Sequence, residues 1–152
     1  MLKLFVYGTL KRGFANHDRF CAGALDVEEA STRGNVYDLP FGFPALVVPP
    51  ESVRALGTTD YTLDAAEQRR LDAPGRLPDS DEARAYGEVF TFEDPEYRLP
   101  GLDHLEGYTP GGRSLYRRVL LPVETSTGSI LAWAYAVEKP TGTHLPGGSW
   151  PS

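Results

Sequence analysis

The stretch Leu2-Lys3-Leu4-Phe5-Val6-Tyr7-Gly8-Thr9-Leu10 begins with an apolar run and changes character at its glycine. A short run containing Phe and Val is typical of a buried β-strand, so we predict a first strand that ends at Gly8. A turn through a glycine can point successive backbone N–H groups outward and form a nest for an anion or a carbonyl oxygen. Tyr7, Gly8, Thr9 and Leu10 are therefore candidate binding residues, and a purely structural turn is the alternative. The stretch is not a phosphate-binding P-loop, because no Gly-Lys-Ser/Thr follows it.

The β signal continues along the chain, with a smaller helical component. Strands are predicted at 34–39, 44–48, 85–92, 115–123 and 130–137, and the last two are joined by a turn at Thr127-Gly128. Helices are predicted at 15–21, at 62–71 with Thr62 as the cap, and between Asp94 and Gly107. Pro100 should interrupt or restart the third helix. The fold class expected from this count is mixed α/β, dominated by strands.

Length, charge and cysteine content limit the classes of protein that this chain can represent. It has 152 residues, 15 of them basic and 21 acidic, which gives a net charge of −6. An acidic chain without a basic block is a poor candidate for binding nucleic acid. No apolar run approaches the roughly 20 residues needed to span a membrane. The one cysteine excludes an internal disulfide and indicates a reducing compartment.

These limits lead to an expected organisation. We expect one cytoplasmic domain over residues 1–152, and the sequence leaves its oligomeric state open. Residues 51–84 are rich in Arg, Asp, Glu and Ala and are broken by prolines, so we expect a surface excursion there with one helix. The chain from about residue 139 is rich in Pro and Gly, and we expect a loosely held tail.

Glu106 is the candidate for acid–base chemistry. Placed on a helix with Leu99 and Leu102, it falls inside the apolar stripe between them. Carboxylates are seldom buried without a partner, and desolvation raises their pKa toward the range useful to a general base. The alternative is that Glu106 pairs with an arginine or caps a backbone group near the helix end.

Two predicted strands carry further candidates. Tyr116 and Arg118 share one face of the strand predicted at 115–123, where they are suited to bind a carboxylate or position a catalytic acid. A strand edge with solvated arginines is the alternative. Trp133 and Tyr135 share one face of the next strand and line either the core or a pocket. The three histidines show no metal-ligand spacing, and no serine lies in a Gly-x-Ser-x-Gly turn.

Six short motifs together resemble the γ-glutamylcyclotransferase-like family, which includes the AIG2-like proteins and the γ-glutamylamine cyclotransferases. The resemblance covers almost the whole chain and departs at residues 51–84, where family members have a much shorter connection. The motifs are, in order, Tyr7-Gly8-Thr9-Leu10, Gly42-Phe43-Pro44-Ala45, Gly87-Glu88-Val89-Phe90, Leu102-Asp103-His104-Leu105-Glu106-Gly107, Tyr116-Arg117-Arg118 and Ala132-Trp133-Ala134-Tyr135.

This resemblance implies a small mixed α/β fold around a β-barrel, with a cavity at one end. It implies that the loop at residues 7–10 binds the γ-glutamyl part of a small-molecule substrate and that Glu106 is the general base. The reaction would be an intramolecular cyclisation, of acyltransferase or lyase type, that yields 5-oxoproline and a free amine without a metal or other cofactor. Tyr7, Tyr116 and Tyr135 are candidates to orient the base or the substrate carboxylate, and Arg118 ranks behind them.

Two other functions fit the same residues. A non-catalytic module would bind a small carboxylate in the same pocket. A deprotecting enzyme would remove a γ-glutamyl group from a larger metabolite, with residues 51–84 shaping the mouth of the pocket or forming an oligomer contact.

Overall fold

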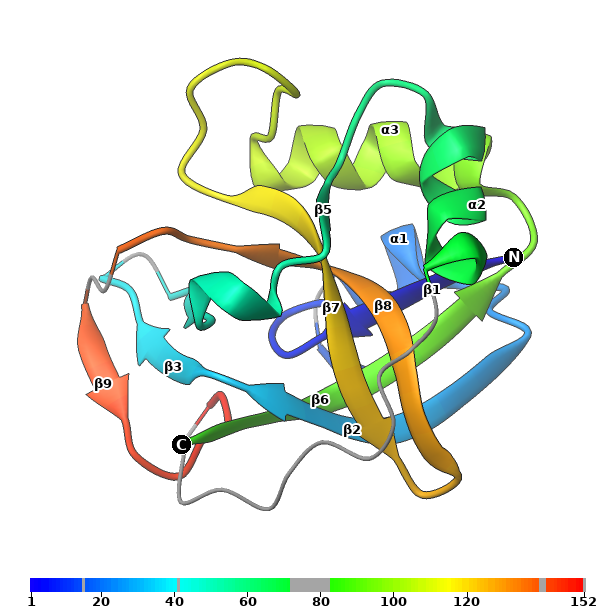
Figure 1. The fold of residues 1–152 in the computed structure, drawn as a ribbon. Coiled ribbons are helices and arrows are strands. Elements are labelled where there is room, and N and C mark those ends of the chain that lie inside the picture. Colours follow the sequence, from blue (N-terminus) through cyan, green and yellow to red (C-terminus); the bar gives the residue numbers. More distant parts are fainter. Residues whose placement is uncertain (15, 41, 72–82, 140–141, 152) are drawn as a thin grey trace.

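A closed, barrel-like sheet forms the centre of the protein (Figure 1). The computed structural model describes residues 1–14, 16–40, 42–71, 83–139 and 142–151. Around the barrel the strands follow the order β2 (Asp26–Arg33), β6 (Arg84–Phe92), β1 (Leu2–Val6), β8 (Gly128–Ala136) and β7 (Arg117–Thr125), and β2 also pairs with β7. The short strand β5 (Ala55–Leu56) adds to β7. The predicted fold class, mixed α/β with a small barrel-like sheet and a few short helices, is confirmed.

Strand β1 is buried on both faces, which explains its continuous apolar sequence. It pairs antiparallel with β6, with Leu2 opposite Phe92, and parallel with β8. Leu4 and Val6 belong to one apolar cluster, whereas Phe5 and Tyr7 belong to the cluster formed by the inward faces of the barrel strands. The alternation of period two along the strand separates these two sets.

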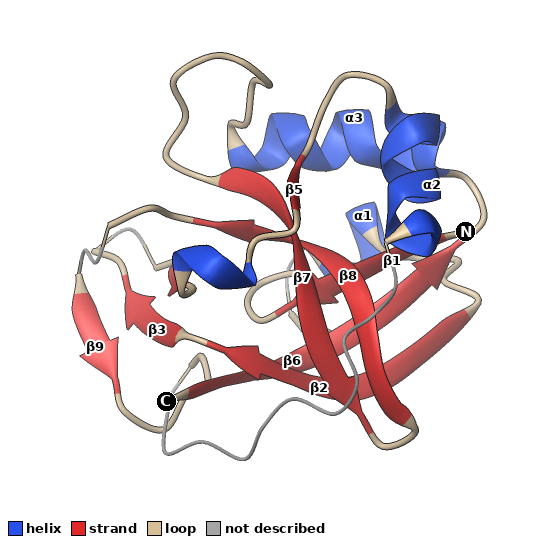
Figure 2. Ribbon diagram, in the orientation of Figure 1, coloured by secondary structure: helices blue, strands red, loops and turns tan. Residues whose placement is uncertain are grey.

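The helices lie together on one side of the barrel (Figure 2). They are α1 (His17–Phe20), α2 (Tyr61–Arg70) and α3 (Pro95–Glu106), and a 3₁₀ turn lies at Pro50–Ser52. Leu99 and Leu102 of α3 are fully buried in the same cluster as Leu4 and Val6. The outward face of the sheet thus packs under α3, and this packing fixes the helix that ends at Glu106.

A second, small sheet contains β4 (Pro44–Val47), β3 (Asn35–Asp38) and β9 (Thr143–Leu145). Strand β9 comes from the segment that we expected to be loose, and that expectation is wrong for residues 143–150. β9 pairs with β3, and the Trp150 Nε1–H donates to Asp38 Oδ1 at 3.0 Å. The amide of Tyr86 also donates to the Gly148 carbonyl at 2.8 Å, so two parts of the fold hold this segment.

Several predicted elements differ from the observed ones in their bounds. The sequence analysis missed β2, whose residues DVEEASTR are mostly polar because much of the strand faces solvent. The strand predicted at 115–123 begins at Arg117, and the helix predicted at 15–21 spans only His17–Phe20. Helix α2 begins at Tyr61, and Asp60 caps it by accepting the Leu63 N–H at 3.0 Å, so the assignment of Thr62 as the cap is wrong.

Helix α3 continues through Pro100, where we predicted an interruption. Pro100 is exposed, so its ring faces solvent. Leu99 and Leu102 on either side are fully buried, and their packing favours a continuous helix. Gly107 ends α3 with a positive φ of 67°, as its predicted C′ position requires.

Residues 51–71 are not the surface excursion that we expected. β5 pairs with β7, and α2 buries Ala65 and Asp64 against the rest of the protein. The sequence of α2 has almost no apolar periodicity, because one of its buried side chains is a carboxylate, Asp64, that pairs with Arg118. The burial of this helix was therefore not visible in the sequence. Residues 72–82 lie outside the described part of the chain.

Candidate active site

The seven residues singled out for the site all line one cavity of about 40 Å³. That volume is enough for about three water-sized groups. The candidates come from the end of β1, the end of α3, the start of β7 and strand β8. They are Tyr7, Gly8, Thr9, Leu10, Glu106, Tyr116 and Tyr135.

Glu106 is the last residue of α3 and is half-buried at the cavity wall. Its carboxylate forms no hydrogen bond or ion pair with any other described residue. Burial raises the pKa of the Glu106 carboxyl from its ordinary value to about 7. Among the described residues, no arginine and no backbone group holds the Glu106 carboxylate, so the alternative is not observed in this part of the chain. A carboxylate in this state is suited to take and return a proton near neutral pH.

The loop after β1 turns tightly and presents its amides. The Lys11 N–H donates to the Gly8 carbonyl at 3.0 Å, and the Asn16 amide donates to the Thr9 carbonyl at 3.1 Å. No described residue accepts a hydrogen bond from the amides of Gly8, Thr9 or Leu10. These three donors on the cavity wall are available to an oxyanion or a carboxylate.

Position 8 requires a glycine because the Pro44 ring lies close to its backbone, and not because of its backbone angles. A Cβ at this position would lie 2.4 Å from Cγ of Pro44 and 2.9 Å from its Cδ. Pro44 itself lines the cavity beside Gly8. A larger residue at position 8 would therefore push the loop and the Pro44 ring apart.

Two tyrosine hydroxyls donate to backbone carbonyls at the cavity. The Tyr7 hydroxyl donates to the Tyr135 carbonyl at 2.5 Å, and the Tyr116 hydroxyl donates to the Pro44 carbonyl at 2.6 Å. Burial raises the pKa of both phenols, and the nearby Glu106 carboxylate raises them further. Both groups therefore stay protonated, and each keeps an oxygen lone pair with which to accept a hydrogen bond.

The Tyr135 hydroxyl is already engaged in a hydrogen bond behind the cavity wall. It donates to Asp103 Oδ1 at 2.6 Å, and burial followed by the Asp103 charge raises its pKa well above the ordinary value. Tyr135 therefore lines the cavity with its ring, while its hydroxyl belongs to a buried polar cluster behind it. Within the predicted site, this is the residue whose polar group points elsewhere.

Arg118 lies at the centre of this buried cluster. It lies neither in the candidate site nor at a solvated strand edge, the two positions considered from the sequence. It is 0% exposed, so it is not a solvated edge residue, and among the described residues it lines neither the candidate cavity nor the hollow next to it. Its guanidinium bonds to Asp103 Oδ1 and to Asp64 Oδ2, each at 2.8 Å. Burial alone would lower the pKa of Arg118, but the two carboxylates raise it above its ordinary value. An arginine beside the apolar run Val119-Leu120-Leu121 was the available signal that a buried partner must exist.

Comparison with known protein families places the chain in one of them. The family model described as gamma-glutamyl cyclotransferase, AIG2-like, matches residues 4–74 and 73–152. The chain belongs to this family. The resemblance seen in the six motifs is thereby confirmed.

Individual relatives show how far the likeness extends. The chain is 28% identical over 141 residues to the gamma-L-glutamyl-butirosin B gamma-glutamyl cyclotransferase of Niallia circulans, covering 91% of this chain and 69% of the relative. The solved structure of YkqA from Bacillus subtilis superposes with a TM-score of 0.60 at 25% identity, covering 98% of this chain but 39% of that one. An AIG2-like protein of Mus musculus superposes with a TM-score of 0.57 at 20% identity, covering 93% of this chain and 80% of that one, which shows a shared fold.

Four further residues that were not predicted from the sequence form part of the cavity wall. Phe5, Val6, Phe43 and Pro44 also line it. The motif Gly42-Phe43-Pro44-Ala45 was recognised without a role for any of its residues, and the contact between Pro44 and Gly8 now supplies one.

Among the described residues, no three His, Cys, Asp or Glu side chains gather closely enough to hold a metal ion. The prediction that this family member needs no cofactor therefore stays a prediction. None of the described helices combines the length and the apolar character needed to cross a bilayer.

Proposed function

We propose that the protein cyclises a γ-glutamyl amide to 5-oxoproline and a free amine, with Glu106 as the general base and then the general acid. One observation carries this proposal: a carboxylate with a pKa of about 7 and no described partner lines the same cavity as three unpaired backbone amides. Family membership supports the reaction class.

The reaction begins with the substrate's α-ammonium group, which is not nucleophilic. The Glu106 carboxylate takes one proton from it, and the neutral amine then attacks the γ-carbonyl carbon of the same molecule. Nucleophile and electrophile are already linked, so the cavity needs only to hold the folded conformer. The attack closes a five-membered ring and leaves negative charge on the carbonyl oxygen.

The second half of the reaction returns the protons. The backbone amides of Gly8, Thr9 and Leu10 donate to the developing oxyanion or to the α-carboxylate. Glu106 passes the protons from the attacking nitrogen to the departing nitrogen, and the bond from the γ-carbon to that nitrogen breaks. The α-ammonium substrate thus becomes a lactam and a protonated amine, and all atoms balance without water.

The tyrosines have supporting roles in this proposal. Tyr7 and Tyr116 accept hydrogen bonds through their oxygens, from the α-ammonium group or from protonated Glu106. Tyr135 contributes its ring to the wall. These roles follow from the directions in which the three hydroxyls already donate.

The test is detection of 5-oxoproline by mass spectrometry after incubation with several γ-glutamyl compounds. We expect Glu106→Gln to keep the fold and to lower turnover by about 10²–10⁴-fold. Glu96→Gln is the matched control, because Glu96 lies on the same helix and is exposed. Unchanged turnover in Glu106→Gln would refute the role of Glu106, and binding without any product would favour a non-catalytic module.

A second candidate substrate is a larger metabolite that carries a γ-glutamyl protecting group. The relative from Niallia circulans, whose name specifies a γ-glutamyl derivative of butirosin B, favours it. Residues 51–71 line neither the cavity nor the hollow next to it, so this part of the supposed excursion does not shape the mouth. A γ-glutamyl aminoglycoside turned over faster than a γ-glutamyl alkylamide would support this candidate.

A further inference from the structure

A second hollow of about 380 Å³ adjoins the cavity. The two share Thr9, Phe43, Glu106 and Tyr116, so Glu106 stands at their boundary. The departing nitrogen must lie within reach of Glu106, and the Glu106 side chain lines both spaces. The adjoining hollow, which we call the outer groove, is therefore where the rest of the substrate extends.

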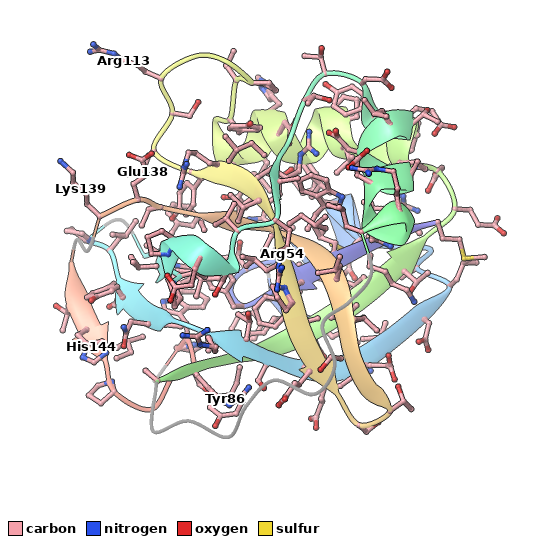
Figure 3. All side chains as sticks on the ribbon, viewed as in Figure 1. Arg54, Tyr86, Arg113, Glu138, Lys139 and His144 are labelled. Carbon is pink, nitrogen blue, oxygen red and sulfur yellow. The ribbon has the colours of Figure 1, made fainter. Side chains whose placement is uncertain are left out.

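The outer groove is apolar and has no cationic wall. Besides the four shared residues, it is lined by Asn16, Leu39, Leu105 and Leu115. Among the described lining residues there is no Lys, Arg or His, and Glu106 is the one carboxylate. Arg113 and Lys139 are exposed and point outward from the periphery of the molecule (Figure 3).

We propose that the outer groove selects γ-glutamyl amides whose amine portion is uncharged and apolar. This inference rests on the proposed function and specifies its substrate class. It disfavours the second candidate substrate, because an aminoglycoside carries several ammonium groups. A carboxylate on the amine portion, as in a γ-glutamyl peptide, would lose hydration beside three leucines and meet the charge of Glu106 without a cation to pair with. An ammonium group would also lose hydration there. An alkyl or aryl chain instead covers the leucines and Phe43.

The groove makes a quantitative prediction for a series of substrates. Each methylene added to the amine should raise kcat/KM about fourfold until the groove is filled, which corresponds to about 0.8 kcal/mol per methylene. The series is γ-glutamyl methylamide, propylamide and pentylamide. Charged counterparts of matched size are γ-glutamylglycine and the amide of 1,4-diaminobutane.

The experiment measures kcat/KM for 5-oxoproline release and, separately, binding of each compound to Glu106→Gln by calorimetry. We expect the propylamide to exceed γ-glutamylglycine, and the pentylamide to exceed the diaminobutane amide, by tenfold or more in both measurements. Equal or reversed preference in binding would overturn the inference. If product forms but the charged compounds are preferred, the groove assignment fails and the proposed function stands.

Failure of the reaction itself is distinguishable, because the binding measurement needs no turnover. If no compound yields 5-oxoproline, the proposed function fails. The apolar preference is then measured on the wild-type protein, where equal binding of all five compounds would also overturn the groove.

A variant adds an independent check. Leu115 is 55% exposed at the groove, so Leu115→Lys should place a cation at its rim without disturbing the core. We expect the ratio of kcat/KM for propylamide over γ-glutamylglycine to fall at least tenfold, with the corresponding binding ratio falling as well. Leu63→Lys, at a 49% exposed leucine on α2 that lines neither hollow, is the matched control and should leave both ratios unchanged. Unaltered ratios in Leu115→Lys would contradict the placement of the amine portion.

Discussion

Glu106 owes its raised pKa to its place at the end of α3, where the helix leaves the carboxylate half-buried and without a described partner. Because a general base acts in its deprotonated form, we expect kcat/KM to rise with pH through about 7 and then level off. Measurement of 5-oxoproline release between pH 5 and about pH 9 gives the profile. An inflection near the ordinary glutamate value of 4.5 would contradict the burial effect.

The same carboxylate also makes stability depend on pH. The folded state holds the Glu106 proton up to a pH of about 7, whereas the unfolded state releases it near 4.5. Stability is therefore lost as pH rises between these values, by up to about 3 kcal/mol. We expect Glu106→Gln to raise the free energy of unfolding at pH 8 and to change it little at pH 4, as measured by urea denaturation. Glu96→Gln should show no such dependence on pH.

Gly8 offers a test of the contact between the loop and Pro44. Gly8→Ala places a Cβ 2.4 Å from the Pro44 ring, so we expect a loss of about 1–3 kcal/mol of stability. We also expect lower kcat/KM, because the Pro44 carbonyl holds the Tyr116 hydroxyl. Gly147→Ala is the matched control, since a Cβ there meets no heavy atom within 4 Å. Normal kinetics in Gly8→Ala would show that the loop tolerates the displacement.

At the scale of single residues, a local conflict in the sequence was enough to single out residues that line the cavity, and their roles stay predictions. A carboxylate inside an apolar stripe pointed to Glu106, and a glycine after a buried strand pointed to the loop. It did not show that the Tyr135 hydroxyl turns to Asp103, because that choice depends on a partner 32 residues away.

At the scale of elements, α3 is tied to the barrel by ionic contacts as well as by its leucines. Arg118 on β7 bonds to Asp103 on α3 and to Asp64 on α2. Asp103 lies one helical turn before Glu106, so the same contact that joins the elements also fixes the angle of the helix end. The sequence could not reveal this cluster, because three elements distant along the chain supply its charges.

Removing the Arg118 guanidinium should therefore lower the stability of the protein. Arg118→Met leaves two buried carboxylates unpaired, and we expect a loss of about 3–5 kcal/mol in the free energy of unfolding. Arg70→Met is the control: Arg70 pairs with Glu67 on the exposed face of α2, and such pairs contribute about 0–1 kcal/mol. Equal losses in the two variants would show that the buried cluster does not hold α3.

At the scale of the whole molecule, the cavity exists because the barrel gathers distant segments. The end of β1, the residues before β4, the end of α3 and the segment entering β7 meet at one place. Sequence patterns predicted most of these elements individually. Without the resemblance to a family, however, the patterns did not predict the closure of β2 onto β7, since pairing between remote strands leaves no local trace.

The C-terminal segment joins this assembly at the loop that carries the unpaired amides. The Trp150 ring contacts Phe14 with centroids 5.7 Å apart, the Trp150 carbonyl accepts the Lys11 ammonium, and its indole bonds to Asp38. We expect Trp150→Ala to lower stability and to speed amide hydrogen exchange in residues 8–14, because the loop loses its cover. Trp150→Phe keeps a ring against Phe14 and loses the bond to Asp38, so it should retain most of the protection in the loop. If exchange in residues 8–14 is unchanged in Trp150→Ala while stability falls, the segment supports the small sheet and does not hold the loop in place.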